Sequence, residues 1–371
     1  MQLNSSSGAR RRGCTRQVLA ISLVVLGAAF GGGSPAATLM ADADSRPALA
    51  VQSYSQAAIL ALQDTGKRLV AVGERGLILY SDDGGSNWRQ AKVPVSVTLT
   101  AVHFPTPEHG WAVGHFGSIL HSDDGGRTWS VQLRGEQAAQ LVREEAMALE
   151  AGPSRDTALI NAQRLLDDGP DKPFLDVYFA DERHGFAIGA FNLIMQTADG
   201  GQTWRSYSAR LDNPGARHLY AIAGSRNELY IAGEEGRVFH SKNNGATFVR
   251  LATPYQGSYF TVTARNDGVV IAGLRGNAFR SSDHGNTWSR LELRHPVSVV
   301  ASQLQPDGRV LLLNQTGQLL VSKGPDESLM SPLAEVAVAA PTSMVRVADG
   351  ELLVGSLQGI VRTAATAKAE Q

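Results

Sequence analysis

The chain has 371 residues, of which 43% are hydrophobic, 39 are glycine and 15 are proline, and its formal net charge is −1. This composition is typical of a globular protein with many tight turns. The near-neutral charge excludes the strongly basic surface that nucleic-acid binding needs, so we expect no nucleic-acid partner.

The first 36 residues have the order of regions found in a secretory signal peptide. Arginines between Arg10 and Arg16 precede an apolar stretch, Val18 to Phe30, and small residues follow. Cleavage is expected after Ala36 or Ala43. The apolar stretch is short for a membrane span, so an uncleaved anchor is the alternative. We therefore expect an exported, periplasmic protein, with 1–36 as signal peptide and 37–47 as a linker.

The only cysteine, Cys14, lies in the basic part of this segment. The mature chain is therefore expected to lack disulfides, cysteine-ligated zinc and thiol chemistry. Because Cys14 precedes the apolar stretch, it is not placed for lipid attachment. No later segment has the long apolar run of a transmembrane helix, so we expect no membrane span in the mature chain.

One pattern recurs along the rest of the chain. An apolar run ends in Gly, and then come two variable residues, usually a second Gly, another apolar run, and S-x-D-x-G-x-T-W. The residues that open these short turns are Gly73, Gly114, Gly189, Gly233, Gly273, Asn314 and Gly355. Their spacing is about 41 residues, apart from one interval of 75. Because one four-stranded propeller blade has this period, the seven units predict a seven-bladed β-propeller over 48–363, followed by a tail at 364–371.

The strands of a unit are named a to d along the chain. In the second unit they are expected at Leu99–Phe104, Trp111–Gly114, Gly117–Ser122 and Trp129–Gln132. The G-x-x-G elements are then the turns between strands b and c, where glycine supplies the positive φ of a two-residue turn. Asn192 replaces the second glycine in the third unit, and Asn is the next most tolerant residue there.

The S-x-D-x-G-x-T-W element is an Asp box, in which each position has a mechanical reason. The Asp side chain binds backbone N–H groups of its own turn, the Gly allows a left-handed conformation, and the Trp packs under the hairpin. A calcium site is not expected, because one carboxylate per turn is too few ligands. The acidic and aromatic positions are filled by Asp83, Trp88, Asp124, Trp129, Asp199, Trp204, Asn243, Phe248, Asp283 and Trp288.

Two regions depart from the simple repeat. The seventh unit ends after strand c, Ile360 to Thr363, so we expect the segment around Ala48 to Ser53 to supply its fourth strand and close the ring. Between blades 2 and 3, the apolar spacing in Glu136–Ala151 and Thr157–Leu166 predicts two amphipathic helices. Residues 135–172 are thus expected to form an α-helical insertion.

Two units also share L-x-x-V-x-F followed by H-G-W/F-A-V/I-G. The motifs begin at Leu99 and His109 in one unit and at Leu175 and His184 in the other. In the second of these units the Leu and the Val are one residue closer together. With the D-G-G-x-T-W boxes, these motifs resemble the photosynthesis-system-II assembly/stability factor family of exported Asp-box propellers. The resemblance covers roughly 57–362. It implies a propeller that escorts a membrane protein during assembly through a basic patch, whereas only scattered arginines are found here.

Sialidases also use Asp-box propellers, so a glycoside hydrolase or a glycan-binding propeller is the alternative. A sialidase needs three converging arginines, a tyrosine–glutamate pair and an acid/base residue. No F-R-I-P-like motif occurs, and no spacing singles out the available candidates. These candidates are Arg68, Arg217, Arg237, Arg346, Tyr178, Tyr220, Glu74, Glu234 and Glu235. We therefore expect no enzymatic activity.

The nine histidines show no H-x-H or H-E-x-x-H spacing. His109 and His184 recur at one blade position, before the Gly that starts strand b, which favours a turn role over a metal role. We expect no metal and no cofactor.

In an antiparallel blade the b–c turns share one face with the d–a connections. The variable pairs of the b–c turns, called b–c tips below, differ in every blade, and variable loops on a rigid scaffold favour recognition. Phe116 and Phe191 are expected to be exposed interface anchors, unless they tuck beneath the helical insertion. We expect a monomer that binds a protein of a membrane or envelope complex through Glu74, Arg75, His115, Phe116, Phe191, Glu234, Glu235 and Arg275.

Overall fold

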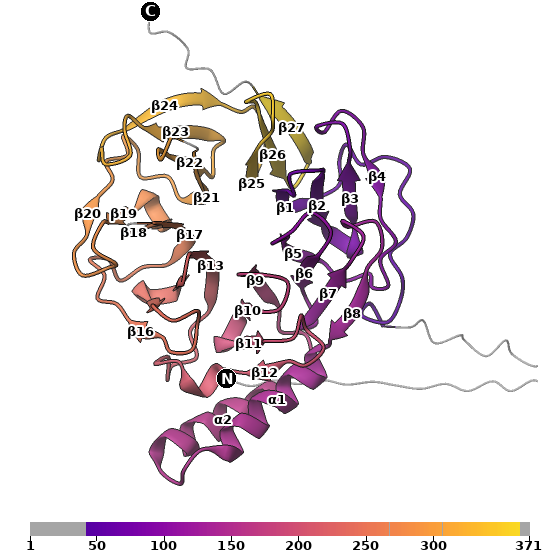
Figure 1. Cartoon of the computed structure of the whole chain (residues 1–371), viewed down its shortest axis with the longest axis vertical. Coiled ribbons are helices and arrows are strands. Elements are labelled where there is room, and N and C mark those ends of the chain that lie inside the picture. Colours follow the sequence, from indigo (N-terminus) through magenta and orange to yellow (C-terminus); the bar gives the residue numbers. More distant parts are fainter. Residues whose placement is uncertain (1–41, 267, 306, 364–371) are drawn as a thin grey trace, which may run out of the picture. The chain divides into compact units, whose positions relative to one another are not determined.

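The computed structural model describes residues 42–266, 268–305 and 307–363. The expected signal peptide, most of its cleavage region and the tail at 364–371 lie outside these residues. In the described part, seven antiparallel sheets are arranged around a common centre (Figure 1). The prediction of a seven-bladed propeller is confirmed.

Each of the first six sheets has four strands, and the seventh has three. Blades 1 to 3 contain β1 (Ile59–Asp64), β2 (Leu69–Gly73), β3 (Ile78–Ser81), β4 (Arg89–Gln90), β5 (Leu99–His103), β6 (Gly110–Gly114), β7 (Ser118–Ser122), β8 (Ser130–Leu133), β9 (Phe174–Phe179), β10 (Gly185–Gly189), β11 (Ile194–Thr197) and β12 (Arg205–Ser206). Blades 4 and 5 contain β13 (Leu219–Ser225), β14 (Glu228–Gly233), β15 (Val238–Ser241), β16 (Val249–Arg250), β17 (Tyr259–Arg265), β18 (Gly268–Gly273), β19 (Ala278–Ser281) and β20 (Ser289–Arg290). Blades 6 and 7 contain β21 (Val299–Leu304), β22 (Val310–Asn314), β23 (Gln318–Ser322), β24 (Met330–Glu335), β25 (Pro341–Arg346), β26 (Leu352–Ser356) and β27 (Gly359–Thr363).

The b strands form the core of the ring. Every residue of β2, β6 and β10 is buried, because each strand b is covered on both faces by the neighbouring blades. Their continuous apolar runs, rather than an alternation of apolar and polar residues, are the sequence signal of this burial. The b strands therefore hold successive blades together through side-chain packing.

The glycine that opens a b–c turn was expected to supply a positive φ, but it is required because strand a approaches it closely. Gly73 has φ −167°, which is extended backbone, so it does not supply a positive φ. A Cβ at Gly73 would lie 1.9 Å from the carbonyl oxygen of Ala58, and one at Gly114 would lie 2.2 Å from that of Thr98. The first glycine therefore permits a close approach to strand a. The positive φ occurs two and three residues after this glycine, as at Arg75 and Gly76.

The Asp boxes have the expected structure. Asp124 Oδ1 accepts the backbone N–H groups of Arg127 and Thr128 at 2.9 and 3.0 Å. The Ser that opens the box adds a bond from its own oxygen, as when Ser122 Oγ accepts the N–H of Gly126 at 2.8 Å. Asn243 replaces Asp in blade 4 and still accepts the N–H of Thr247 at 2.9 Å. Each box is thus held by its own side chains.

Hydrogen bonds show which loops share a face. The N–H of Gly76 in a b–c turn donates to Val97 in a d–a connection at 2.6 Å, and Gly236 donates to Gly257 at 2.8 Å. On the other side, Gly125 in an Asp box donates to Glu108 in an a–b loop at 2.8 Å. The b–c turns and d–a connections therefore form one face, and the Asp boxes and a–b loops form the other.

The prediction that the segment around Ala48 to Ser53 completes blade 7 is wrong: among the described residues, β27 has no outer partner. The segment is occupied elsewhere, because the N–H of Ala48 donates to Val93 at 3.0 Å and Gln90 bonds both Leu49 and Val51. Residues 42–51, which include the second half of the expected linker, run along the d–a connection between blades 1 and 2.

Side-chain packing closes the ring instead. Leu69 of β2 packs against Val345 of β25 and Leu353 of β26. The hydroxyl of Thr342 donates to the carbonyl of Ile59 at 2.6 Å, and Arg362 of β27 donates to the carbonyl of Gly84 at 2.9 Å. The blade 7–blade 1 junction is therefore built like the other inter-blade junctions.

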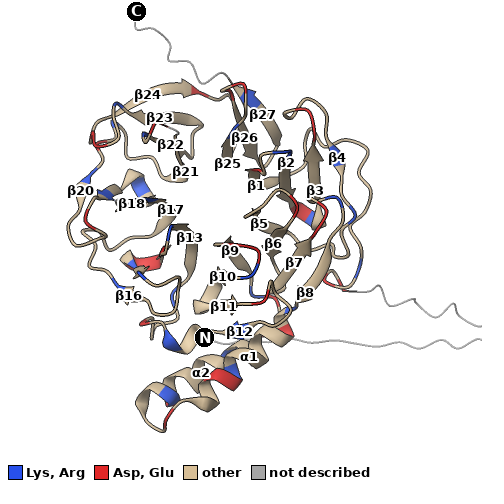
Figure 2. Cartoon of the chain, viewed as in Figure 1, with Lys and Arg blue, Asp and Glu red and all other residues tan. Residues whose placement is uncertain are grey.

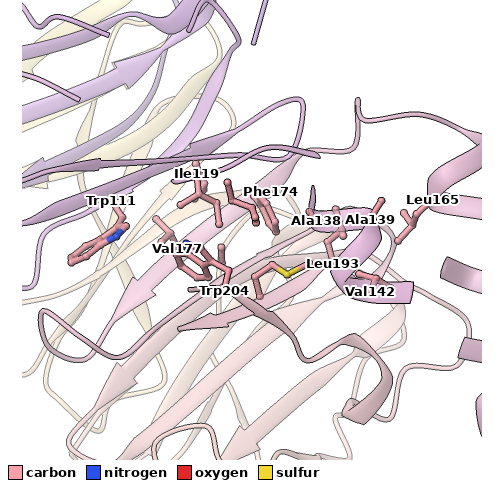
Figure 3. Packing of buried hydrophobic residues seen from close by; sticks show 14 of the residues in the cluster. Trp111, Ile119, Ala138, Ala139, Val142, Leu165, Phe174, Val177, Leu193 and Trp204 are labelled. Carbon is pink, nitrogen blue, oxygen red and sulfur yellow. The ribbon is translucent and has the colours of Figure 1, made fainter. Parts of the chain in front are cut away.

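The insertion between blades 2 and 3 consists of α1 (Gly135–Ala148) and α2 (Pro153–Asp167), which confirms the predicted α-hairpin. It lies at the outer rim beside β12 (Figure 1). Ala138 and Val142 of α1 and Leu165 of α2 share one buried cluster with the core of blades 2 and 3 (Figure 3). The insertion is therefore packed onto the propeller. No helix in the described ranges is long and apolar enough to cross a bilayer.

Candidate binding face

The b–c tips share one backbone geometry. The N–H of the first tip residue donates to strand a, as from Glu74 to Ala58 and from Leu274 to Ser258 at 3.0 and 2.9 Å. The second tip residue is left-handed in all five Asp-box blades, with φ between 52° and 56°. Because backbone bonds hold the tip, its second side chain is not needed to maintain the turn.

Two of the predicted partner-binding residues are committed to the scaffold. Glu74 Oε1 accepts the N–H of Ala58 at 3.1 Å, and Glu234 Oε2 accepts the N–H of His218 at 3.1 Å. Each carboxylate thereby caps the start of its own strand a. This hydrogen bond makes Glu74 and Glu234 poor candidates for contact with a partner.

The exposed charged tips differ from blade to blade. Arg75 and Arg275 point outward, and among the described residues no ion pair is formed by either. Glu235 is exposed but pairs with Arg217 at 2.7 Å, and His115 is exposed on blade 2. Acidic and basic positions are interleaved around the described part of the ring (Figure 2). The tip charges therefore form a mixed surface.

Phe116 is half-buried, so the expectation of an exposed anchor is wrong at this position. Its ring packs with the core of blades 1 and 2. Its backbone carbonyl accepts the N–H of Gly135 at 2.9 Å, and the N–H of Gly117 donates to Lys172 at 3.0 Å. Both ends of the insertion are therefore attached to the tip of blade 2, and this attachment explains why Phe116 is not free.

Phe191 remains available on the tip of blade 3, with 39% of its surface exposed. Its ring meets His218 edge to face, at 4.8 Å between ring centroids, and the ammonium of Lys172 lies 5.9 Å from the ring centroid. The N–H of Phe191 donates to Nδ1 of His218 at 2.9 Å, so the backbone of this tip is also held by blade 4. An exposed aromatic ring on a rigid support has the features of an interface anchor.

A groove of about 370 Å³ lies close to Phe191. One wall is the first half of α2, from Pro153 to Asn161, and the other is the connection between blades 3 and 4, from Ser208 to Pro214. A smaller recess beside it is lined by Phe191, Leu165 and Ala146. Phe191 therefore borders the space under α2 while part of its ring stays exposed, so each of the two expectations for this residue holds in part.

Asn192 holds the floor of this groove. Its amide nitrogen donates to the carbonyl of Ser208 at 2.8 Å, and its amide oxygen accepts a bond from the side chain of Asn213 at 2.9 Å. Asn213 also donates to the carbonyl of Arg217 at 2.8 Å. A glycine at position 192 would satisfy the turn, with its φ of 63°, but would make none of these side-chain bonds. The substitution of Asn for Gly was the only sequence signal of this groove.

The groove itself could not be found from the sequence. Its walls come from the insertion and from a d–a connection roughly fifty residues later, and no motif links the two segments. The packing of α1 and α2 against β12 and the 208–210 segment brings them together.

The residues considered as glycosidase candidates each contact a different part of the propeller. Arg68 is buried and binds Asp82 and the carbonyl of Gly125 on the Asp-box face. Arg217 pairs with Glu235 on the opposite face, and Arg346 donates to the carbonyl of Gly350. Tyr178 packs on His103, at 5.0 Å between ring centroids, and Tyr220 on Phe260 at 5.4 Å. These contacts stabilise the propeller, and they do not bring the three arginines to one carboxylate-binding point.

One half-buried carboxyl in the inner strands was not identified from the sequence. Burial raises the pKa of Asp176 on β9 to about 7, although the N–H groups of Ile222 and Val177 both donate to it at 2.8 Å. The bond to Ile222 joins blade 3 to blade 4. The contacts of this half-buried side chain are those of a link between blades.

His109 and His184 both lie where an a–b loop enters strand b. The ring of His109 stacks on His121 at 5.7 Å, while Nδ1 of His184 lies 2.9 Å from the carboxylate of Asp181. Asp181 also accepts the N–H groups of Arg183 and His184. These contacts fit the turn role expected for the two histidines.

Comparison with known proteins gives a family over most of the chain. The sequence profile of the family described as photosynthesis system II assembly factor YCF48 matches residues 81–150 and 160–355. Photosystem II assembly lipoprotein Ycf48 of Synechococcus sp. (strain CC9902) is 36% identical over 92 residues, which are 24% of this chain and 28% of that protein. The protein of the same name from Synechococcus sp. (strain RCC307) is 48% identical over 44 residues, 12% of each chain. The matched region thus spans less than a third of the length of these relatives.

Solved propellers with TM-scores of 0.59 share the fold. YCF48 from Cyanidioschyzon merolae has a TM-score of 0.59 at 14% identity, covering 85% of this chain and 98% of that one. The WD40 propeller domain of Doa1 has the same TM-score at 11% identity, covering 85% and 95%. A structure described as YCF48 bound to D1 peptide has a TM-score of 0.42 at 24% identity, covering 49% and 59%.

Proposed function

The chain belongs to the photosynthesis system II assembly factor YCF48 family, and from that membership we propose that it is a non-enzymatic, monomeric propeller that binds a protein during assembly of a membrane or envelope complex. The fold alone does not decide between binding and catalysis, since propellers serve many functions. The proposal therefore depends on the family and on one surface of the molecule, the face formed by the b–c tips.

The exposed ring of Phe191 beside a groove supports this location for the binding site. A surface aromatic that is held by neighbouring residues loses little conformational freedom on binding. His218 contacts the ring edge to face and also accepts the N–H of Phe191, so the anchor is pre-positioned. On the groove side, Asn192 and Asn213 hold the wall in place.

The shape and chemistry of the groove indicate the kind of partner. A volume of about 370 Å³ is at the lower end of the range for ligand sites and fits a few side chains of an extended peptide segment. Ser208 and the exposed Thr157 offer polar groups to a peptide backbone, while the recess beside Phe191 is lined mainly by apolar side chains. We propose a partner segment with one apolar or aromatic side chain flanked by accessible backbone.

Site-specific photo-crosslinking tests the location. A photoreactive phenylalanine analogue at Phe191 is expected to capture one defined protein from a membrane extract, and the same analogue at Arg183, an exposed residue of an a–b loop, is expected not to capture it. Phe191→Ala should weaken binding of the captured protein about tenfold or more, as expected for an anchor residue. Capture from position 183 with none from position 191 would place the partner on the opposite face.

We also propose that the protein is exported to the periplasm. The support is the order of basic, apolar and small residues within the first 36 positions. Mass spectrometry of the N-terminus after cell fractionation tests this proposal. A periplasmic chain beginning near Ala37 is expected, and an intact N-terminus retained in the membrane fraction would contradict it.

A further inference from the structure

Three potential metal ligands meet on the Asp-box face, between blades 4 and 5. Glu228 begins β14, His240 lies on β15, and His284 lies in the Asp box of blade 5. Their ligand atoms all lie within 4.8 Å of one another. The cluster is separate from the face formed by the b–c tips and does not depend on the proposed function.

The distances suit a small transition-metal ion. Glu228 Oε2 lies 2.9 Å from His284 Nδ1 and 3.2 Å from His240 Nε2. Two ligands of a tetrahedral Zn²⁺ site, each about 2.0–2.1 Å from the metal, are separated by about 3.4 Å. A small outward movement of the exposed His284 ring would therefore create the required space.

The position of His240 also supports a bound metal ion. Its side chain is 4% exposed, and Nε2 lies 3.2 Å from Oε2 of Glu228 without the geometry of a full hydrogen bond. The ring is held by stacking on Tyr230 at 4.3 Å with an interplanar angle of 5°. A buried polar atom without a hydrogen bond normally costs stability, so its presence calls for an explanation. A bound metal ion would satisfy it.

Surrounding groups support a ligand role. The hydroxyl of Tyr230 donates to Glu228 Oε2 at 2.8 Å and orients the carboxylate. With His284 more than a third exposed, solvent can reach the cluster and fill the remaining coordination position.

We propose that Glu228, His240 and His284 bind a divalent transition-metal ion such as Zn²⁺, which joins blade 4 to blade 5. Two imidazoles and a carboxylate form a donor set that suits zinc and its neighbours in the first transition row. At the same place between blades 1 and 2, Arg68 crosses the junction by donating to the carbonyl of Gly125 at 2.9 Å. The metal ion would link blades 4 and 5 at the position where Arg68 links blades 1 and 2.

His284→Gly is the most informative variant. His284 has φ 61°, and the boxes of blades 1, 2 and 3 carry glycine at this position, so the substitution should preserve the turn. Glu228→Gln keeps the shape of the side chain and removes its charge. His121→Ala is the matched control, because His121 occupies the position in blade 2 that His240 has in blade 4, stacks on His109 and forms no ion pair among the described residues.

Equilibrium dialysis of the purified, tag-free protein against micromolar ZnCl₂ is expected to give one zinc per chain. His284→Gly and Glu228→Gln should weaken zinc binding about tenfold or more, and His121→Ala should leave it unchanged. Zinc should raise Tm by several degrees in the unsubstituted protein and not in His284→Gly. No binding at micromolar zinc, or equal binding by the unsubstituted protein and His284→Gly, would overturn the proposal.

Discussion

Asp boxes and b–c tips recur on opposite faces of the same blades, but different groups hold them in place. In an Asp box, side chains maintain the turn, as when Asp283 accepts the N–H of Thr287 at 2.8 Å. In a b–c tip, the backbone maintains the turn, as when Leu274 donates to the carbonyl of Ser258. The box must therefore repeat its residues, whereas the tip can change its exposed side chain. This difference explains why recognition can develop on one face at little cost in stability.

The largest effect is expected from the aromatic residue of a box. Trp129 is buried, packs edge to face on Phe104 and donates from Nε1 to the carbonyl of Gly126 at 3.1 Å. Trp129→Ala should lower the free energy of unfolding by about 3–5 kcal/mol, measured by urea denaturation. Trp88→Ala, at a half-buried position, should cost less. Equal effects would show that burial does not determine the contribution of these residues.

Glycine substitutions test the account of the b–c turn. A Cβ at Gly273 would lie 2.3 Å from the carbonyl oxygen of Ser258, so Gly273→Ala should cost about 2 kcal/mol or more. Arg275→Gly, two residues later, should change stability by less than about 1 kcal/mol, because relief of the left-handed strain offsets the added chain entropy. Thermal unfolding of both variants gives the comparison. If Gly273→Ala left the melting temperature unchanged, close approach to the carbonyl of Ser258 would not be the reason for this glycine.

Strong acid is expected to weaken the Asp boxes by protonating their carboxylates. Hydrogen bonds from the side chain and N–H of Thr287 lower the pKa of Asp283 to about 2. The stability that this carboxylate contributes is therefore present above about pH 4 and is lost as the pH falls toward 2. Asp283→Asn, which copies Asn243 of blade 4, should leave stability at neutral pH nearly unchanged and reduce the loss in acid. Urea denaturation across this pH range measures the free energy of unfolding. An equal loss of stability in acid for both proteins would show that the Asp283 carboxylate does not cause it.

The smallest effects are expected at the exposed tip arginines. Arg75→Ala and Arg275→Ala should each change the free energy of unfolding by less than about 0.5 kcal/mol, because backbone bonds hold both turns. Chemical denaturation of the two variants measures this change. A loss above 1 kcal/mol, on the order of a typical core effect, would mean that the tip side chains also maintain the scaffold.

The repeat accounts for how much of the fold could be predicted. Gly114, Ser122, Asp124 and Trp129 each make a contact inside a single blade, so a short motif contains all the information for it. The helices were predictable for the same reason, since their apolar spacing is local. The role of the first glycine was misjudged, because a turn pattern does not show that the carbonyl of strand a lies 2.2 Å from the missing Cβ.

The seven blades, the Asp boxes and the α-hairpin are encoded locally, because each depends on residues close together in the chain. Long-range packing sets how the ring closes, why Phe116 is half-buried while Phe191 is 39% exposed, and where the groove and the Glu228–His240–His284 cluster lie. These features come from segments that meet across blades or across the insertion. Residues 42–51, for example, lie on the connection between blades 1 and 2 because the hydrogen bonds of Val93 and Ser96 are available there.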